Sequence, residues 1–289
     1  MILDRKTFFE LMDAAFRKWL DHNASLRAAA LAYFIILPLP LLLLIMLTIF
    51  TLIYGQVGAF EALIQQITTF AGPVVAELIR QLLESVTSPF NSVLTSLVSL
   101  GFTVLGAVGA FGVLQDTLNR IWEVPKSKRS LIDRLKRNSI PFSIIFILGV
   151  TIIIWTILTT VLTDFIGVVL YPFASDIISI ILPITQIGLS FALASLLFAI
   201  IYKQIPEVPI HWKDVKIAAI ITSLMFTSTN YLIGTVIENF TITSLPGLAG
   251  ILIILLSWLY LINQFILFGA AFSNVYAKKS GSRSLKHEE

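Results

Sequence analysis

The sequence predicts an all-α fold, a polytopic membrane helical bundle of six transmembrane helices. Only 13% of the 289 residues are charged and 57% are hydrophobic, whereas soluble domains carry about 25% charged residues. Six segments are apolar over the roughly 20 residues that a helix needs to cross a bilayer. In a six-span chain, every Lys and Arg except Arg80 falls on one side of the membrane. Helices satisfy their own backbone groups in lipid, so these spans form a helical bundle.

We expect the spans at residues 28–54, 92–118, 142–163, 180–202, 215–237 and 247–276. Residues 1–23 then form a cytoplasmic amphipathic helix, 24–277 the six-helix transmembrane domain and 278–289 a cytoplasmic tail. The first apolar run starts late and is longer than the roughly 7–15 residues of a signal-peptide core. The first span is therefore expected to remain in the protein.

The basic residues set the predicted orientation, because cytoplasmic loops retain Lys and Arg. They occur before the first span, between spans two and three, between spans four and five, and in the tail. Arg80 instead shares the opposite side with Glu61, Glu77, Glu84, Asp164, Asp176 and Glu238. Both termini are therefore predicted to be cytoplasmic. The strongly basic segment 120–137 fits this topological role better than a nucleic-acid site.

Two amphipathic helices are expected outside the spans. The first opens at the capping-box spacing Thr7–Glu10 and is expected to lie along the inner leaflet. Its apolar side is Phe8, Phe9, Met12, Phe16, Trp19 and Leu20. The second starts at Gly72-Pro73, inside the long connection 55–91, and should lie flat at the outer surface or cap the bundle. Its apolar side is Val74, Val75, Leu78, Ile79, Leu82, Leu83 and Val86.

Two prolines interrupt the first span. Pro38 cannot donate a hydrogen bond to the carbonyl of Phe34, and Pro40 cannot donate to that of Ile36. The freed carbonyls need partners from neighbouring helices or from water in a cavity. We therefore predict a discontinuous helix here. Arg27 at its inner boundary either sets topology or contacts a substrate.

The second span carries glycine and polar residues on one broad face: Gly101, Gly106, Gly109, Gly112, Asp116, Asn119 and Arg120. The glycines predict close approach of a neighbouring helix. Asp116 lies one turn before Arg120, so it forms a local ion pair at the cytoplasmic end or serves a substrate or proton site. Asn230 in the fifth span and Asn263 and Gln264 in the sixth either bond helices together or line a cavity.

Catalytic and metal-binding patterns are absent from the sequence. There is no cysteine, and His22, His211 and His287 have no second histidine at metal-ligand spacing. The sequence contains neither a phosphate-binding glycine loop with a lysine nor a Gly-x-Ser-x-Gly elbow. We therefore expect no cofactor, no bound metal and no enzymatic activity.

Several stretches together resemble the YihY/BrkB family of prokaryotic inner-membrane proteins. They are Arg27–Tyr33 with Pro38, Gly106–Phe111 with Leu118–Trp122, Tyr202–Pro206 with Trp212–Asp214, Ser257–Tyr260, and Phe268–Ala270. This sequence departs from the family at Leu245–Leu248, where a Tyr-Gly pair is usual. The resemblance implies six spans, cytoplasmic termini and a multi-pass protein of the inner membrane. It also implies that an older ribonuclease label does not apply.

Function is predicted from the broken helix, the glycine face and the intramembrane amides. They favour a transporter or lipid-translocating protein without its own nucleotide motor. Its partners would be membrane lipids and a small-molecule or lipid substrate, and not nucleic acid. The candidate pathway residues are Arg27, Tyr33, Pro38, Pro40, Asp116, Asn119, Asn230 and Gln264. The alternative is a non-transporting scaffold or assembly factor whose polar residues only pack helices.

Overall fold

The computed structural model describes residues 5–87, 93–125, 175–239 and 248–279, and every regular element in these ranges is a helix. The third predicted span and the tail beyond Lys279 lie outside the described residues. Three described helices are long and apolar enough to cross a membrane, over residues 42–71, 184–204 and 250–279. The described part of this membrane protein is therefore all-helical, while the number of six spans stays a prediction.

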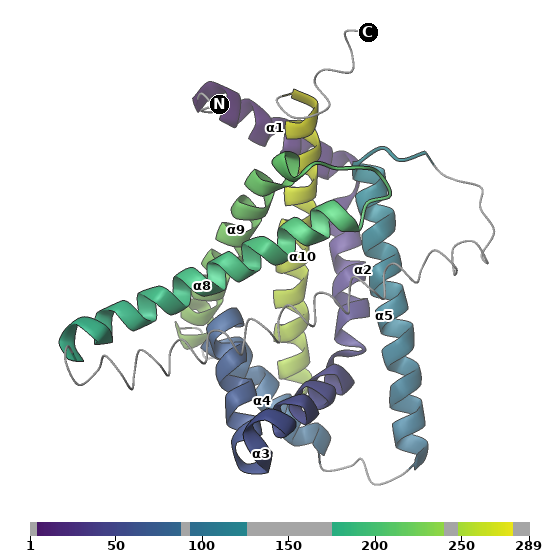
Figure 1. The fold of residues 1–289 in the computed structure, drawn as a ribbon. Coiled ribbons are helices and arrows are strands. Elements are labelled where there is room, and N and C mark those ends of the chain that lie inside the picture. Colours follow the sequence, from purple (N-terminus) through teal and green to yellow (C-terminus); the bar gives the residue numbers. More distant parts are fainter. Residues whose placement is uncertain (1–4, 88–92, 126–174, 240–247, 280–289) are drawn as a thin grey trace.

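The described helices are α1 (Arg5–Asp21), α2 (Ala24–Ile36), α3 (Leu39–Ala71), α4 (Pro73–Thr87), α5 (Val93–Ile121), α8 (Ser175–Gln204), α9 (Trp212–Asn239) and α10 (Leu248–Lys279). The last of these, α10, runs through the middle of the bundle (Figure 1). It contacts α1, α2, α4, α5, α8 and α9. Residues from both ends of the chain thus pack on one central helix.

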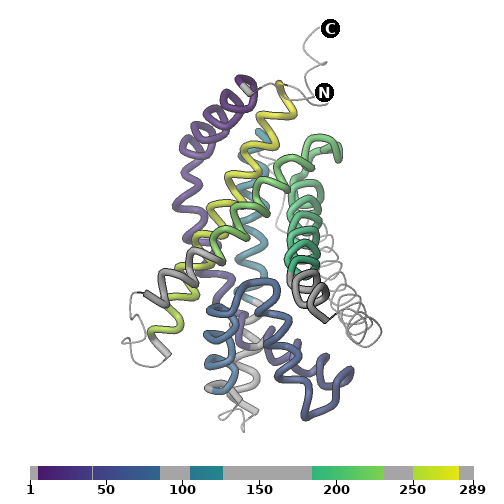
Figure 2. The backbone as a smooth tube through the Cα atoms, turned by 90° about the vertical axis from the view of Figure 1, so that its left-hand side faces the viewer, coloured from purple at the N-terminus to yellow at the C-terminus, as the bar shows by residue number. Residues whose placement is uncertain are grey.

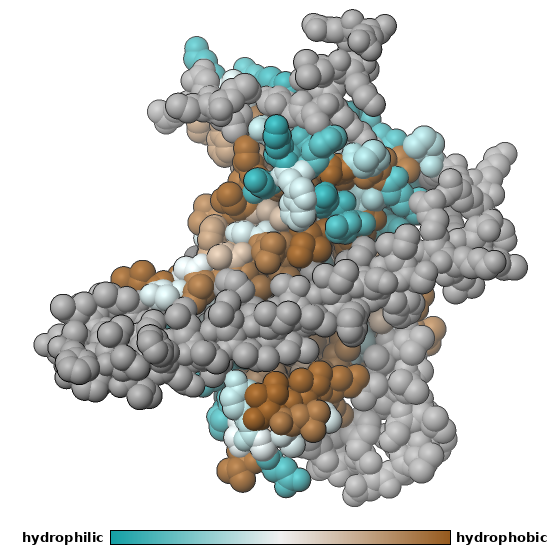
Figure 3. All heavy atoms as spheres, in the orientation of Figure 1, coloured by the Kyte–Doolittle hydropathy of each residue, from teal (hydrophilic) through white to brown (hydrophobic). Residues whose placement is uncertain are grey.

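The bundle has two distinct ends. Helix α1 and the C-terminal part of α10 lie together at one end, which we call the basic end, and the α3–α4 pair lies at the other, the hairpin end (Figures 1 and 2). Among the coloured residues, hydrophilic ones gather toward the basic end, and apolar ones form patches below it (Figure 3). This separation agrees with the predicted orientation, in which one side of the membrane receives nearly all basic residues.

Helix α1 lies across the basic end and turns into α2 at Asn23, which has φ 50° and ψ 42°. Asparagine tolerates this left-handed conformation better than most residues. Leu11 and Ala15 of α1 are fully buried, and Phe8, Met12 and Trp19 pack beside them on the core. The predicted apolar side of this helix is therefore divided, since Phe9, Phe16 and Leu20 are at least half exposed. These three side chains are the part of α1 left to meet a membrane surface.

The predicted break in the first span is confirmed. Helix α2 ends at Ile36, α3 starts at Leu39, and Pro38 between them is buried. Proline at this point removes an intrahelical donor and its ring clashes with the preceding turn. A second change of direction occurs inside α3 at Gly55, where φ is 73°. Glycine populates positive φ without the cost that a side chain would impose.

The assignment of residues 55–91 to a connection that is helical only from residue 73 was wrong in its first part. The chain returns to a helix after Gly55 and stays helical to Ala71. The apolar positions of this part, Ala59, Leu63 and Ile64, are buried against α4. Helix α4 packs on α3 and on Ile251 and Leu255 of α10. The buried members of its predicted apolar side are Val75, Leu78, Ile79, Leu82 and Leu83. Helix α4 therefore caps the bundle, one of the two expected arrangements.

Candidate functional site

The helix break at Pro38 packs on the glycine face of α5. A Cβ atom at Gly106 would lie 2.4 Å from Cδ of Pro38 and 3.0 Å from the carbonyl oxygen of Phe34. At Gly109 it would lie 2.3 Å from the Phe34 ring. Only glycine permits these contacts, so α5 covers the backbone that the proline leaves without its helical partner. Gly112 has no described atom within 4 Å and takes no part in this contact.

Arg27 joins α2 to α5 through an ion pair. Its Nη1 donates to Oδ2 of Asp116 at 2.9 Å and to Oγ1 of Thr117 at 3.4 Å. Arg120 donates from Nε to the same Asp116 oxygen at 2.8 Å. The predicted Asp116–Arg120 pair is present, and Arg27 adds a second cation from another helix. Asp116 is thus shared between two arginines and acts as a link between α2 and α5.

Gln264 belongs to a polar cluster between α2 and α10. Its amide Nε2 donates to Oγ of Ser25 at 3.2 Å, and Ser25 Oγ lies 2.7 Å from the hydroxyl of Tyr260. The Oε1 atom of Gln264 is buried without a hydrogen-bond partner among the described residues. Ser25 and Tyr260 also line a cavity of about 440 Å³ at the start of α2. The cluster joins the two helices, and Gln264 itself does not line this cavity, so the helix-bonding interpretation applies to this amide.

The remaining predicted residues near the basic end have separate roles. Asn119 accepts a hydrogen bond from the backbone N–H of Glu207 at 2.8 Å, which ties α5 to the segment between α8 and α9. Tyr33 is 55% exposed and points away from the described bundle. Pro40 is partly buried in the first turn of α3. The eight predicted residues therefore do not form one site.

Glu123 carries an ion cluster that sequence reasoning did not identify. It ends α5 in the left-handed conformation, with φ 57°. Val124 N–H donates to the Asn119 carbonyl and Glu123 N–H to that of Arg120, the bond pattern of a Schellman motif. Lys18 of α1 and Lys278 of α10 both donate to the Glu123 carboxylate at 2.7 Å. These hydrogen bonds, Lys18 first, lower the pKa of Glu123 from 4.5 to about 2.

A charged cavity of about 550 Å³ lies beside Glu123, between α1 and the end of α10. Arg17 on its wall pairs with Asp13, and Lys279 pairs with Glu10. Burial, together with the positive charge of Lys18, lowers the pKa of His22 on the same wall. The cations that line this cavity are paired with carboxylates, so the arrangement serves to hold α1 on α10.

Asn230 joins three helices near the hairpin end. Its Nδ2 donates to the carbonyl of Phe70 at 3.2 Å, and its Oδ1 accepts from Nε1 of Trp258 at 3.1 Å. Asn230 therefore bonds α9 to the end of α3 and to α10. It also lines a cavity, so this amide has both of the roles that the sequence left open.

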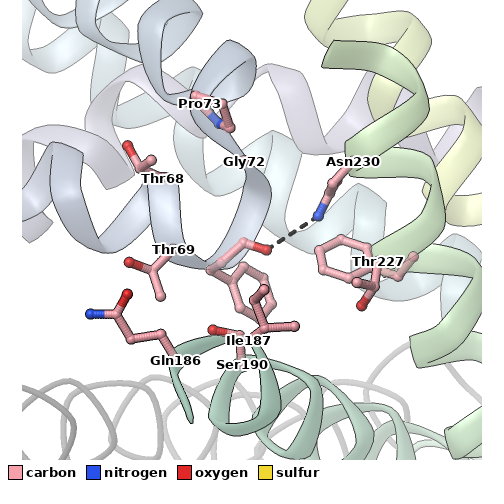
Figure 4. A pocket seen from close by; sticks show the side chains of 11 residues that line it. Thr68, Thr69, Gly72, Pro73, Gln186, Ile187, Ser190, Thr227 and Asn230 are labelled. Carbon is pink, nitrogen blue, oxygen red and sulfur yellow. Dashed lines mark hydrogen bonds between the residues drawn. The ribbon is translucent and has the colours of Figure 1, made fainter. Parts of the chain in front are cut away.

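This cavity has a volume of about 290 Å³ and lies between the α3–α4 junction, α8 and α9 (Figure 4). Apolar walls come from Phe70, Pro73, Ile187 and Phe226. The polar lining residues are Thr68, Thr69, Gln186, Ser190, Thr227 and Asn230. None of the described lining residues is charged. We call this the hairpin-end cavity.

Most residues of the hairpin-end cavity were missed from the sequence. A signal was present for Gln186 and Ser190, which are one helical turn apart in a mostly apolar span. Thr68 and Thr69 gave no signal because residues 55–72 had been assigned to a connection. Asn230 of α9 is the lining residue that the sequence did predict as a candidate. Periodicity identifies a polar face but not the helix that it meets.

The family-like stretches meet one another in the fold. The hydroxyl of Tyr202 donates to the Ile266 carbonyl at 3.0 Å and lies 2.7 Å from Oγ1 of Thr222. Gly269 provides the space, because a Cβ there would lie 2.0 Å from Thr222 Oγ1 and 2.3 Å from the Tyr202 oxygen. Likewise, Pro38 meets Gly106. Segments that are far apart in the sequence thus form single packing units.

A protein-family comparison decides the relationship. The family model described as "Virulence factor BrkB" matches residues 15–289, almost the whole chain. The chain belongs to the BrkB family. The family resemblance of the sequence motifs is thereby confirmed. No curated protein and no solved structure gives a significant match to the chain.

Within the described part of this BrkB-family chain, no group of three or more His, Asp or Glu residues is placed to hold a metal ion. The expectations of no bound metal, no cofactor and no enzymatic activity stay predictions. The chemistry of the described sites is hydrogen bonding and ion pairing, and the hairpin-end cavity combines apolar walls with polar side chains that have no hydrogen-bond partner among the described residues.

Proposed function

We propose that this BrkB-family protein is a membrane transporter or lipid-translocating protein without its own nucleotide motor. The observation that carries the proposal is the hairpin-end cavity, in which side chains that can form hydrogen bonds line a space among apolar helices. Polar groups without a partner are costly in such surroundings, and their usual compensation is a ligand or water. A packing role alone would leave them paired with one another.

The helix geometry supports movement next to this cavity. Helix α3 contributes Thr68, Thr69 and Phe70 to the wall, and the same segment is broken at Pro38 and turned at Gly55. Discontinuous helices beside a binding site are a recurrent feature of transporters, in which helices move around a fixed site. In our proposal the basic end faces the cytoplasm, the chain crosses a prokaryotic inner membrane several times, and the Arg27–Asp116 pair holds the cytoplasmic end together.

Proteoliposomes test this proposal. The full chain is reconstituted, and two kinds of movement are measured: uptake of radiolabelled glucose, myo-inositol and glucose 6-phosphate, and flip-flop of fluorescent glucosyl-diacylglycerol and phosphatidylglycerol. We expect at least one probe to move faster than in empty liposomes. The double variant Gln186→Leu/Ser190→Ala should slow it about 30-fold, since two hydrogen bonds of about 1 kcal/mol each are removed.

The matched control is Gln65→Leu/Ser257→Ala, which makes the same two changes at exposed positions outside the cavity wall. It should retain the wild-type rate. Rates equal to those of empty liposomes for every probe would overturn the proposal. The alternative, a scaffold or assembly factor, predicts that result, so the same measurements separate the two functions.

A further inference from the structure

The hydrogen-bonding groups of the hairpin-end cavity define what it can bind. Side chains from three directions face it, with Thr68 and Thr69 from α3, Gln186 and Ser190 from α8, and Thr227 and Asn230 from α9 (Figure 4). Asn230 already uses its amide on the Phe70 carbonyl and on Trp258. The other polar groups remain to be satisfied by a ligand.

Three of the polar lining side chains have hydrogen-bonding groups that are free to bind a ligand. Gln186, Ser190 and Thr227 make no side-chain hydrogen bond with any residue that the structure describes. Together they offer an amide N–H₂, an amide oxygen and two hydroxyls, which both donate and accept. Thr68 and Thr69 donate to the carbonyls of Ile64 and Gln65, so their oxygens remain as acceptors. A ligand that fits must therefore present donors as well as acceptors on several sides.

The absence of charged side chains among the described lining residues further restricts the chemical class of ligand that the cavity can bind. No described lining residue is a Lys, Arg, His, Asp or Glu, so among these residues a phosphate or carboxylate would meet no cation and an ammonium no carboxylate. A charged group buried without a partner among apolar walls is far more costly than a neutral polar one. Hydroxyl groups are neutral and both donate and accept, which matches the unused side chains.

The shape and volume of the hairpin-end cavity also suit a neutral, hydroxyl-bearing ligand. Phe70 and Phe226 lie 5.2 Å apart between ring centroids and, with Ile187, give the cavity apolar surface for the C–H groups of a ligand. The volume of about 290 Å³ is at the small end of ligand sites, which usually occupy about 300–1,000 Å³. One sugar-sized group fits, whereas a whole lipid does not.

We infer that the hairpin-end cavity binds an uncharged, hydroxyl-rich group, a polyol or a single sugar unit, either free or as the head group of a lipid. This inference rests on the proposed function for its physiological meaning, but binding can be measured separately from transport. In this inference α8 determines which ligand is selected, because its Gln186 and Ser190 supply most of the donors that are free to bind a ligand.

The test measures thermal unfolding of the full chain in lipid nanodiscs by tryptophan fluorescence. Glucose and myo-inositol, at concentrations up to about 100 times a dissociation constant, should raise the midpoint by about 4 °C. Glucose 6-phosphate and inositol phosphate, which add a charged phosphate group to the same ring, should leave it unchanged. A second arm replaces part of the nanodisc lipid with glucosyl-diacylglycerol or, as a charged comparison, phosphatidylglycerol.

Variants link any shift to the cavity. Gln186→Leu/Ser190→Ala should abolish the shift, Thr227→Val should reduce it, and Gln65→Leu/Ser257→Ala should keep it. Shifts with the free sugars support a soluble ligand, and a shift with the glycolipid alone supports a lipid head group. The inference is overturned if no neutral probe shifts the midpoint, if the phosphorylated probes shift it equally, or if the shift persists in the cavity double variant.

The two proposals fail in different ways. Binding of the neutral probes without movement in proteoliposomes would refute transport and keep the inferred ligand class. Cavity-dependent movement of phosphate-bearing probes alone would refute the ligand class and keep transport. Movement of glucose or the glycolipid that the cavity double variant slows would support both.

Discussion

At the scale of single residues, Glu123 combines an unfavourable backbone with favourable side-chain contacts. A non-glycine residue in the left-handed region costs roughly 1–2 kcal/mol, and Glu123 has φ 57°. The same conformation ends α5 and places the carboxylate between Lys18 and Lys278. Backbone strain of this kind persists where surrounding contacts over-determine it. Here those contacts join α1, α5 and α10 at one point.

Glu123 should make stability depend on acid pH. Its folded pKa of about 2 lies below the ordinary 4.5, so its contribution is present above pH 4.5 and is lost as pH falls toward 2. Glu123→Gln should therefore lower the midpoint of thermal unfolding at pH 6, and its difference from wild type should shrink at pH 3. Asp13→Asn, which removes a carboxylate paired only within α1, is the control. A difference that stays constant with pH would contradict the prediction.

Gly269 is the second residue with a specific requirement. Gly269→Ala should destabilise the protein by about 1–3 kcal/mol, since the new Cβ would fall 2.0 Å from Oγ1 of Thr222. Gly188→Ala, at a glycine with no described atom within 4 Å of the added Cβ, should be neutral or slightly stabilising. The measurement is thermal unfolding in detergent. Equal midpoints for the two variants would refute the close contact with Tyr202 and Thr222.

At the scale of elements, α5 is the support for the broken helix formed by α2 and the start of α3. Gly106 and Gly109 bring the helix backbones together next to Phe34 and Pro38. Arg27 and Asp116 then connect α2 and α5 toward the basic end. The ion pair is partly exposed, so it contributes modestly to stability, while the glycine contact sets the distance between the helices.

The glycine contact predicts a difference between two glycines one turn apart. Gly109→Ala should destabilise the bundle by about 1–3 kcal/mol, because its Cβ would overlap the Phe34 ring. Gly112→Ala meets no described atom and should be tolerated or should stabilise α5 by up to about 1 kcal/mol. Thermal unfolding and expression level measure both variants. If Gly112→Ala were the more damaging change, the packing of α5 on α2 would be wrong.

At the scale of the whole molecule, the separation into a basic end and a hairpin end carries the functional argument. The basic end is held by ion clusters around Glu123 and Asp116. The hairpin end instead contains the uncharged cavity, next to the turn at Gly72. Ion pairs thus hold the helices of the basic end together. The hairpin end instead has neutral polar side chains beside the segment that changes direction at Pro38 and at Gly55. We expect movement at the hairpin end and closure at the basic end.

The orientation can be tested because the natural chain has no cysteine. Single substitutions Glu77→Cys at the hairpin end and Lys213→Cys at the basic end are both at exposed positions. A membrane-impermeant maleimide should label Glu77→Cys in intact cells, and Lys213→Cys only after permeabilisation. Labelling of Lys213→Cys in intact cells would reverse the orientation. Labelling of both positions would place the two ends on one side of the membrane and refute the proposed topology.

Much of the fold could be predicted from sequence because the signals are local. Apolar length identified the helical membrane fold, and proline chemistry identified the break between Ile36 and Leu39. The four-residue spacing of Asp116 and Arg120 predicted their ion pair. The helix over residues 56–71 was missed because its charged and polar residues broke the apolar run. The ion cluster at Glu123 was missed because its two lysine partners, Lys18 and Lys278, are far from it in the sequence.

Sequence alone therefore determined the class of protein, the helix break at Pro38 and several of the polar side chains that need partners. Only the tertiary structure decided which partners they have. Arg27 meets Asp116, Asn119 meets the backbone of Glu207, and Asn230 meets Phe70 and Trp258 across long stretches of chain. Periodicity specifies which face of a helix is polar, but the neighbouring helix is chosen by packing of the whole bundle. That packing turned isolated amides and hydroxyls into a cavity with an uncharged lining.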